Sequence, residues 1–147
     1  MRIAAAALLA VSLAAAGCAT GSKPTSSQLS VRDAATGDVL ETVFRYQMEH
    51  YPSDTRYCLD LAGTSPSAEF VRRFEGHQPP VLSAGQCDSQ PGKGLYLRLT
   101  KIEWIVDDEV WIRGATAEGD RSSPIEGYRV VREKGKWSVK AARVHGL

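Results

Sequence analysis

The three histidines are the first residues to consider for catalysis or metal binding. His50, His77 and His145 lie far apart in the chain, and no pair has the four-residue spacing that brings two histidines to one zinc ion. We expect His50 at the end of a helix, where the helix dipole favours a cation. His77 and His145 are interpreted as solvated. The sequence therefore predicts no metal site and no cofactor.

The acidic run formed by Asp107, Asp108 and Glu109 is a weak candidate for a cation site. Calcium loops distribute their oxygen ligands over about twelve residues, whereas this run lies between two segments that alternate like strands. We interpret Asp107 and Asp108 as a solvated turn. If the protein inhibits a secreted hydrolase, this turn is a candidate for the part that blocks the active site.

Three side chains from distant positions are candidates for a ligand cleft. Tyr46 and His50 fall in one predicted helix, and Tyr128 falls in a predicted strand near the end of the chain. A cleft between a helix and a sheet would bring them together. With Asp60 added, the same group would form the pocket of an enzyme.

Trp111 is a candidate for an exposed aromatic side chain at a binding surface. It alternates with Val110 and Ile112, so it should lie on the opposite face of a strand from these two residues. Packing against aromatic side chains of neighbouring strands is the alternative explanation.

The first seventeen residues have the composition of a cleavable export signal. Arg2 is their only charged side chain, and the apolar run over residues 3–16 is shorter than the roughly twenty residues that a membrane-spanning helix needs. Residues 1–17 are therefore predicted to be a signal peptide. A buried, alanine-rich core helix is the alternative.

Small apolar residues precede the first cysteine. They are Leu13, Ala14, Ala15, Ala16 and Gly17, followed by Cys18. This segment resembles the lipobox of bacterial prolipoproteins, although that family most often has Leu where this chain has Ala15. The resemblance implies that the Cys18 thiol receives a diacylglyceryl group and that the signal peptide is cut before it. It also implies that a fatty acid such as palmitate acylates the new amino terminus.

The lipid implied by this resemblance would hold the protein firmly on a membrane. Each buried methylene contributes about 0.8 kcal/mol, so two or three acyl chains bind far more tightly than one. Ala19 rather than Asp follows the cysteine, which in Gram-negative members of the family implies release to the outer membrane. We therefore expect the protein in the bacterial cell envelope, on the periplasmic face of the outer membrane.

The remaining cysteines, Cys58 and Cys87, are expected to form a disulfide. An exported protein with three cysteines has an odd thiol until one of them is assigned to lipid. An oxidising compartment then favours pairing of the other two. Two unpaired buried thiols are the alternative.

The charge balance argues against one class of partner. The chain has 18 Lys and Arg against 17 Asp and Glu, and Arg2 lies in the predicted signal peptide. Nucleic-acid binders usually carry a basic excess on one face. Charge attraction to anionic lipid needs a polybasic patch, which this chain does not offer. We expect no nucleic-acid partner.

Apolar periodicity divides the rest of the chain. Residues 18–30 are polar and small, which is typical of a flexible tether, and residues 31–147 have the size of one domain. A helix is predicted from about residue 38 to Pro52, and a strand at residues 56–62. A second helix is predicted at residues 65–74, with a proline in its first turn.

The second half of the domain is strand-like. Residues 78–94 are expected to form a short edge segment and a loop held by the disulfide. From residue 95 onward, apolar and polar residues alternate between tight turns, which is typical of an antiparallel meander. The alternation shifts between Leu99 and Ile102, which indicates a bulge.

These elements predict an α+β fold in which an N-terminal helix, a short strand and a second helix pack on a four-stranded antiparallel meander. The hairpin over residues 128–139 resembles the closing hairpin of the nuclear-transport-factor-two-like superfamily and of related exported domains of unknown function. That resemblance implies a cone-like fold with a curved sheet, and it carries over no catalytic residue.

The expected function is that of a membrane-anchored envelope lipoprotein that binds an envelope protein or a small ligand and is not an enzyme. One alternative is a periplasmic inhibitor or immunity lipoprotein. The other is an enzyme whose pocket is assembled from sequence-distant residues.

Overall fold

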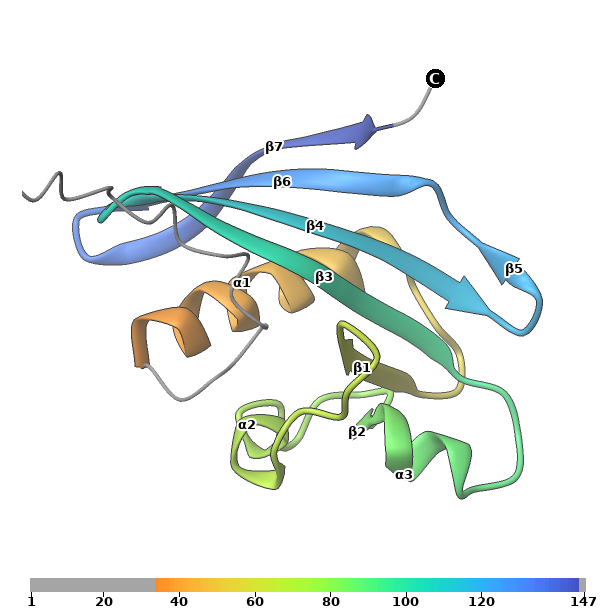
Figure 1. Ribbon diagram of the computed structural model, residues 1–147. Coiled ribbons are helices and arrows are strands. Elements are labelled where there is room, and N and C mark those ends of the chain that lie inside the picture. Colours follow the sequence, from red (N-terminus) through yellow and green to blue (C-terminus); the bar gives the residue numbers. More distant parts are fainter. Residues whose placement is uncertain (1–33, 146–147) are drawn as a thin grey trace, which may run out of the picture.

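The computed structural model describes residues 34–145, which form three helices and a seven-stranded sheet (Figure 1). The helices are α1 (Ala34–His50), α2 (Ala68–Arg72) and α3 (Ala84–Asp88). The strands are β1 (Tyr57–Leu61), β2 (Val81–Ser83), β3 (Leu95–Val106), β4 (Glu109–Glu118), β5 (Arg121–Ser122), β6 (Ile125–Glu133) and β7 (Lys136–His145). The predicted signal peptide, the tether and Cys18 lie outside the described residues.

The strands form an open sheet in the order β2, β1, β3, β4, β6, β7, and β5 pairs with β4. Strands β3, β4, β6 and β7 are antiparallel neighbours, so the predicted α+β class and four-stranded meander are confirmed. The predicted bulge is also confirmed, because the register between β3 and β4 shifts between Leu99 and Lys101.

Strands β1 and β2 extend this sheet in a way that the sequence analysis did not predict. β1 pairs in parallel with β2 on one side and with β3 on the other. Parallel strands need crossover connections, and the short helices α2 and α3 lie in those connections. The expected edge segment is thus β2, a parallel strand at the edge of the main sheet.

Helix α1 covers one face of the sheet and supplies much of the core (Figure 1). Its buried apolar side chains are Val39, Leu40, Val43, Phe44 and Met48. They belong to one hydrophobic cluster with side chains of the central strands, among them Leu59, Leu97, Leu99, Val110, Ile112, Tyr128 and Val130. Each such side chain contributes about 1.5–3 kcal/mol when it leaves water. The predicted helix is confirmed, and it begins earlier than predicted, at Ala34.

Helix α2 is shorter than the helix predicted at residues 65–74. The Ser67 hydroxyl accepts a hydrogen bond from the Phe70 N–H at 3.2 Å, so Ser67 is the N-cap and the helix begins after it. Pro66 therefore precedes the cap and does not lie in the first turn. Beyond the helix, turns bring Phe74 into the core, where its ring packs at 5.7 Å on Phe70.

Helix α3 lies where the sequence analysis expected a loop. Ser83 and Gln86 form a capping box, in which the Ser83 hydroxyl accepts from the Gln86 N–H and the Gln86 side chain accepts from the Ser83 N–H. A five-residue helix is too short for apolar periodicity to reveal it. The capping pair was the available signal.

A disulfide joins Cys58 on β1 to Cys87 on α3, as predicted. Leu59 and Leu61 face the core beneath α1, so Cys58, which alternates with them, faces the other side of the sheet. The disulfide therefore holds α3 on the face that α1 leaves uncovered. Gly94 permits this close packing, because a β-carbon there would lie 2.5 Å from the Cys58 sulfur.

Replacement of both cysteines by alanine should lower the free energy of unfolding. The bridge spans a sequence separation of 29, and the loop-entropy model gives about 3.5 kcal/mol for a loop of that size. Urea unfolding followed by tryptophan fluorescence measures the change. The unmutated protein under reducing conditions is the control and should lose a similar amount; an unchanged midpoint in both samples would contradict a stabilising disulfide.

Candidate functional site

The structure brings together the three side chains predicted to line a cleft. The Tyr46 and His50 rings stack with centroids 3.8 Å apart, and the Tyr46 and Tyr128 rings form a T-shaped pair with centroids 5.8 Å apart. Nδ1 of His50 lies 2.8 Å from the Tyr46 carbonyl oxygen in the last turn of α1, where a helix-end role was expected. Tyr128 is fully buried, so it does not line an open cleft, and the cluster packs α1 on the sheet.

A chain of hydrogen bonds continues from this cluster into the core. The Gln47 amide donates to the Tyr128 hydroxyl at 3.1 Å, and that hydroxyl donates to Oε2 of Glu126 at 2.6 Å. The Tyr51 hydroxyl donates to the other oxygen of Glu126. Burial, reinforced by the bond to Glu126, raises the pKa of Tyr51 to about 12, and the same two causes raise the pKa of Tyr128 further.

Gln47 was not singled out as a functional residue, although it occupies a position in the predicted apolar stripe. A glutamine within an apolar stripe is the sequence signal that could have indicated a polar contact inside the core. In the structure the Gln47 side chain is fully buried. Gly114 on β4 makes room for it, because a β-carbon there would lie 3.2 Å from Nε2 of Gln47 and 2.6 Å from the Arg98 carbonyl oxygen.

Asp60, the fourth residue of the hypothetical enzyme pocket, does not join the cluster. It alternates on β1 with core residues Leu59 and Leu61, and it faces the side of the sheet opposite Tyr128. One of its oxygens accepts from Nε of Arg98 at 2.6 Å, and the other accepts from the Gly63 N–H at 2.8 Å. Asp60 therefore supports local structure far from Tyr46 and His50.

Trp111 lies where the sequence analysis placed it, on the opposite face of β4 from the buried residues Val110 and Ile112. Its side chain is half-buried. It lines a shallow depression of about 240 Å³ together with Lys101, Glu103, Arg113 and Gly127. Lys101 and Glu103, two residues apart on β3, form an ion pair at 3.0 Å. A binding role for Trp111 stays a prediction.

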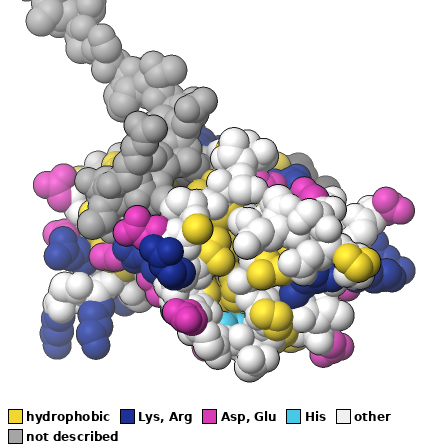
Figure 2. Space-filling model, turned by 90° about the horizontal axis from the view of Figure 1, so that it is seen from below, with side chains coloured by type: hydrophobic (Ala, Val, Ile, Leu, Met, Phe, Trp, Pro, Cys, Tyr) yellow, Lys and Arg dark blue, Asp and Glu magenta, His cyan; other side chains and the backbone are white. Residues whose placement is uncertain are grey.

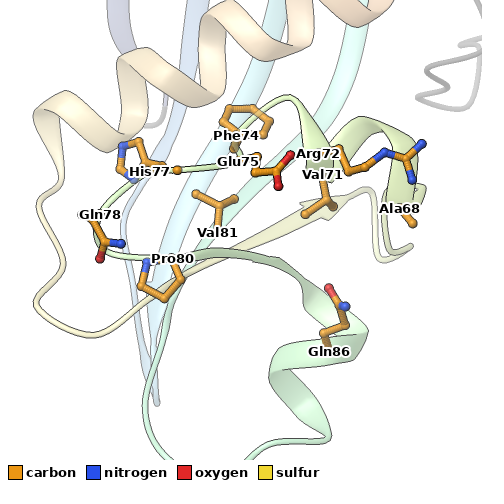
Figure 3. Close-up of a pocket in the computed structure, with 11 residues that line it drawn as sticks. Ala68, Val71, Arg72, Phe74, Glu75, His77, Gln78, Pro80, Val81 and Gln86 are labelled. Carbon is orange, nitrogen blue, oxygen red and sulfur yellow. The ribbon is translucent and has the colours of Figure 1, made fainter.

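A further candidate site is a groove of about 440 Å³ between α2, the segment that follows it, and β2 (Figure 3). Its apolar lining consists of Ala68, Val71, Phe74, Pro80 and Val81. Its polar lining consists of Arg72, Glu75, His77, Gln78 and Gln86, with Gly76 completing the wall. Seen from below, hydrophobic side chains gather in the middle of this face and charged side chains surround them (Figure 2).

The floor of this groove is fixed by the core. Phe74 packs against Phe44 of α1 with ring centroids 6.4 Å apart, and His77 forms a T-shaped pair with Tyr57 of β1 at 5.6 Å. Nδ1 of His77 lies 2.8 Å from the Pro79 carbonyl oxygen. The prediction of a solvated His77 was therefore wrong: tertiary contacts that the sequence does not reveal hold its ring half-buried at one end of the groove.

The groove can hold an apolar side chain between polar groups of both charges.

Among residues 34–145, no three His, Cys, Asp or Glu side chains lie close enough to hold a metal ion. No helix in the same part of the chain is both long enough and apolar enough to cross a membrane. Comparison of the chain with protein-family models, curated proteins and solved structures gives no match.

Tyr51 should remain protonated well above pH 10 in the folded protein. An unfolded tyrosine ionises near pH 10, and the folded pKa is about 12. The contribution of Tyr51 to stability is therefore complete below pH 10 and is lost as the pH rises toward 12. The absorbance of the tyrosinate band is measured against pH for the wild type and for Tyr51→Phe. The difference between the two curves is the titration of Tyr51.

Glu126→Gln is the matched variant for this titration. It keeps the side-chain shape and removes the carboxylate, so the pKa of Tyr51 should fall below its wild-type value while the part caused by burial remains. Ionisation of Tyr51 near pH 10 in the folded wild-type protein would show that this contact does not form in solution.

Proposed function

We propose that the protein is an envelope lipoprotein, anchored through lipid on Cys18, whose domain binds an apolar group of a protein or small ligand and catalyses no reaction. The order of a short apolar run, small residues and Cys18 supports the anchor. The disulfide between Cys58 and Cys87 supports an oxidising compartment. Ala19 after the cysteine supports the periplasmic face of the outer membrane in a Gram-negative cell.

The observation that carries the binding role is the groove between α2 and β2. Its volume of about 440 Å³ is within the range of small-ligand sites. Its floor is apolar, and its rim offers a cation at Arg72, an anion at Glu75 and the imidazole of His77. Such a site favours one or two apolar side chains, or a small amphipathic molecule, with polar groups that reach the rim.

The edge of β2 argues for insertion of side chains and against addition of a strand. β2 has three residues, and the N–H of Ser83 is already bonded to Oε1 of Gln86 at 3.0 Å. A peptide strand laid along this edge would find few free backbone groups. We therefore assign recognition to the groove lining and not to the backbone of β2.

Cys18→Ser should abolish the anchor. The wild-type protein should carry acyl mass after removal of residues 1–17 and sediment with membranes, whereas the variant should lack that mass and remain soluble after cell lysis. Intact mass and membrane fractionation measure both properties. A soluble wild-type protein without acyl mass would refute the anchor and leave the third thiol unexplained.

A photo-crosslinking amino acid at Glu75, on the rim, should capture the partner in cells. The same amino acid at Lys140, an exposed position on β7, is the control and should capture nothing. Val71→Gln places an amide in the apolar floor and should reduce capture from position 75 about tenfold, because a buried apolar contact of about 1.4 kcal/mol is lost. Equal capture from both positions, insensitive to Val71→Gln, would refute the groove as the binding site.

A further inference from the structure

Three consecutive apolar side chains are exposed at the end of β3. They are Trp104, Ile105 and Val106, with 40%, 51% and 60% of their surface exposed. We call them the apolar tip. Among the described residues, one further large apolar side chain, Ile125, is exposed, and it lies at the start of β6. Contiguous exposed apolar residues usually mark a contact surface, whereas a single one does not.

The apolar tip is held firmly in place. The register between β3 and β4 shifts between Trp104 and Val106, and this interrupts the alternation that would bury every second side chain. The Trp104 ring packs edge-on against Trp137 of β7 at 5.8 Å. The Arg132 N–H donates to the carbonyl oxygen of Asp108 at 2.8 Å, which ties the turn after the tip to β6.

The tip lies at the end of the domain from which the chain leads back to Cys18. Figure 1 shows the start of α1 at the same end as the β3–β4 and β6–β7 turns. Trp104 and Asp107 line one depression of about 450 Å³ with Ala35 and Thr36, the second and third residues of α1. The attachment of the domain to its N-terminal segment is thus adjacent to the apolar tip.

The length of that N-terminal segment restricts how far the tip can lie from an anchor. Fifteen residues, 19–33, separate Cys18 from Ala34. A chain of fifteen residues spans at most about 55 Å when it is fully extended. A tether in this range gives an effective concentration in the millimolar range at the membrane surface, so even a weak apolar contact would be populated.

We infer that the apolar tip contacts the interface of the phospholipid bilayer that holds the Cys18 lipid. Tryptophan is enriched at the boundary between headgroups and acyl chains, and apolar side chains beside it can be buried there. Charge does not provide the attraction, because Asp107, Asp108 and Glu133 balance Arg132, Lys134 and Lys136 in and beside the β3–β4 and β6–β7 turns, and Glu109 is paired with Arg129. The contact is therefore insensitive to salt and needs no anionic lipid. This inference rests on the lipid anchor proposed above.

The contact would also orient the groove. The groove belongs to α2, β2 and α3, away from the end that carries the β3–β4 turn (Figure 1). With the tip at the bilayer, the groove remains open to the aqueous compartment. The anchor then sets the distance of the domain from the membrane, and the tip sets its orientation.

The test uses full-length acylated protein in phosphatidylcholine vesicles whose acyl chains carry bromine, a short-range quencher of tryptophan fluorescence. Trp111→Phe with Trp137→Phe leaves Trp104 as the reporter. Trp104→Phe with Trp137→Phe leaves Trp111, on the outer face of the sheet, as the matched reporter. Emission of Trp104 should fall about twofold relative to vesicles without bromine, and emission of Trp111 should not change.

Ile105→Ser with Val106→Ser should restore the emission of Trp104 while flotation with vesicles, which depends on the lipid, is unchanged. Ile125→Ser changes an exposed apolar residue elsewhere and should have no effect. An acylated, vesicle-bound protein whose Trp104 is not quenched refutes this inference alone. If Trp104 is instead shielded from the bromine only at high protein concentration or after a partner protein is added, that result refutes the membrane contact and indicates a protein contact. A protein without acyl mass refutes the anchor and this inference together.

Discussion

Burial of one face of α1 against β3, β6 and β7 is the interaction on which the remaining structure depends. The helix gives the sheet an inner and an outer face, and every strand then places alternate residues on one or the other. Phe44 on α1 also contacts Phe70 and Phe74, so the same packing fixes the segment around α2. The wall of the groove is therefore an extension of the core.

The parts of the fold that could be predicted are those with many repeats of one pattern. The stripe along α1 and the alternation in β3, β4, β6 and β7 both extend over nine or more residues, and the shifted alternation after Leu99 revealed the bulge. β2 and α3 have three and five residues, too few for a period. The position of β2 follows from its pairing with β1, and that of α3 from its disulfide to β1. Parallel pairing leaves no turn motif in the sequence, because the strands are joined through other elements.

The candidate sites, too, could be predicted only where they lie on long, periodic elements. Tyr46, His50 and Tyr128 were predicted to meet because one helix must cross the sheet, and they do meet, as packed rings. The groove could not be predicted, since its lining comes from α2, α3 and the loop before β2, and their relative placement depends on the core and the disulfide. A side chain such as His77 therefore looks solvated in the sequence and is half-buried in the fold.

The disulfide between Cys58 and Cys87 protects the groove against a single cut in the chain. Every residue that lines the groove lies between Cys58 and Cys87, so the groove is built inside a closed covalent ring. A protease that cuts one peptide bond within this ring opens it but releases no fragment, because both ends remain linked through sulfur. The hydrophobic contacts of Phe70 and Phe74 can then hold the cut segment in place. A domain built in this way can lose a peptide bond in an exposed loop and keep its groove.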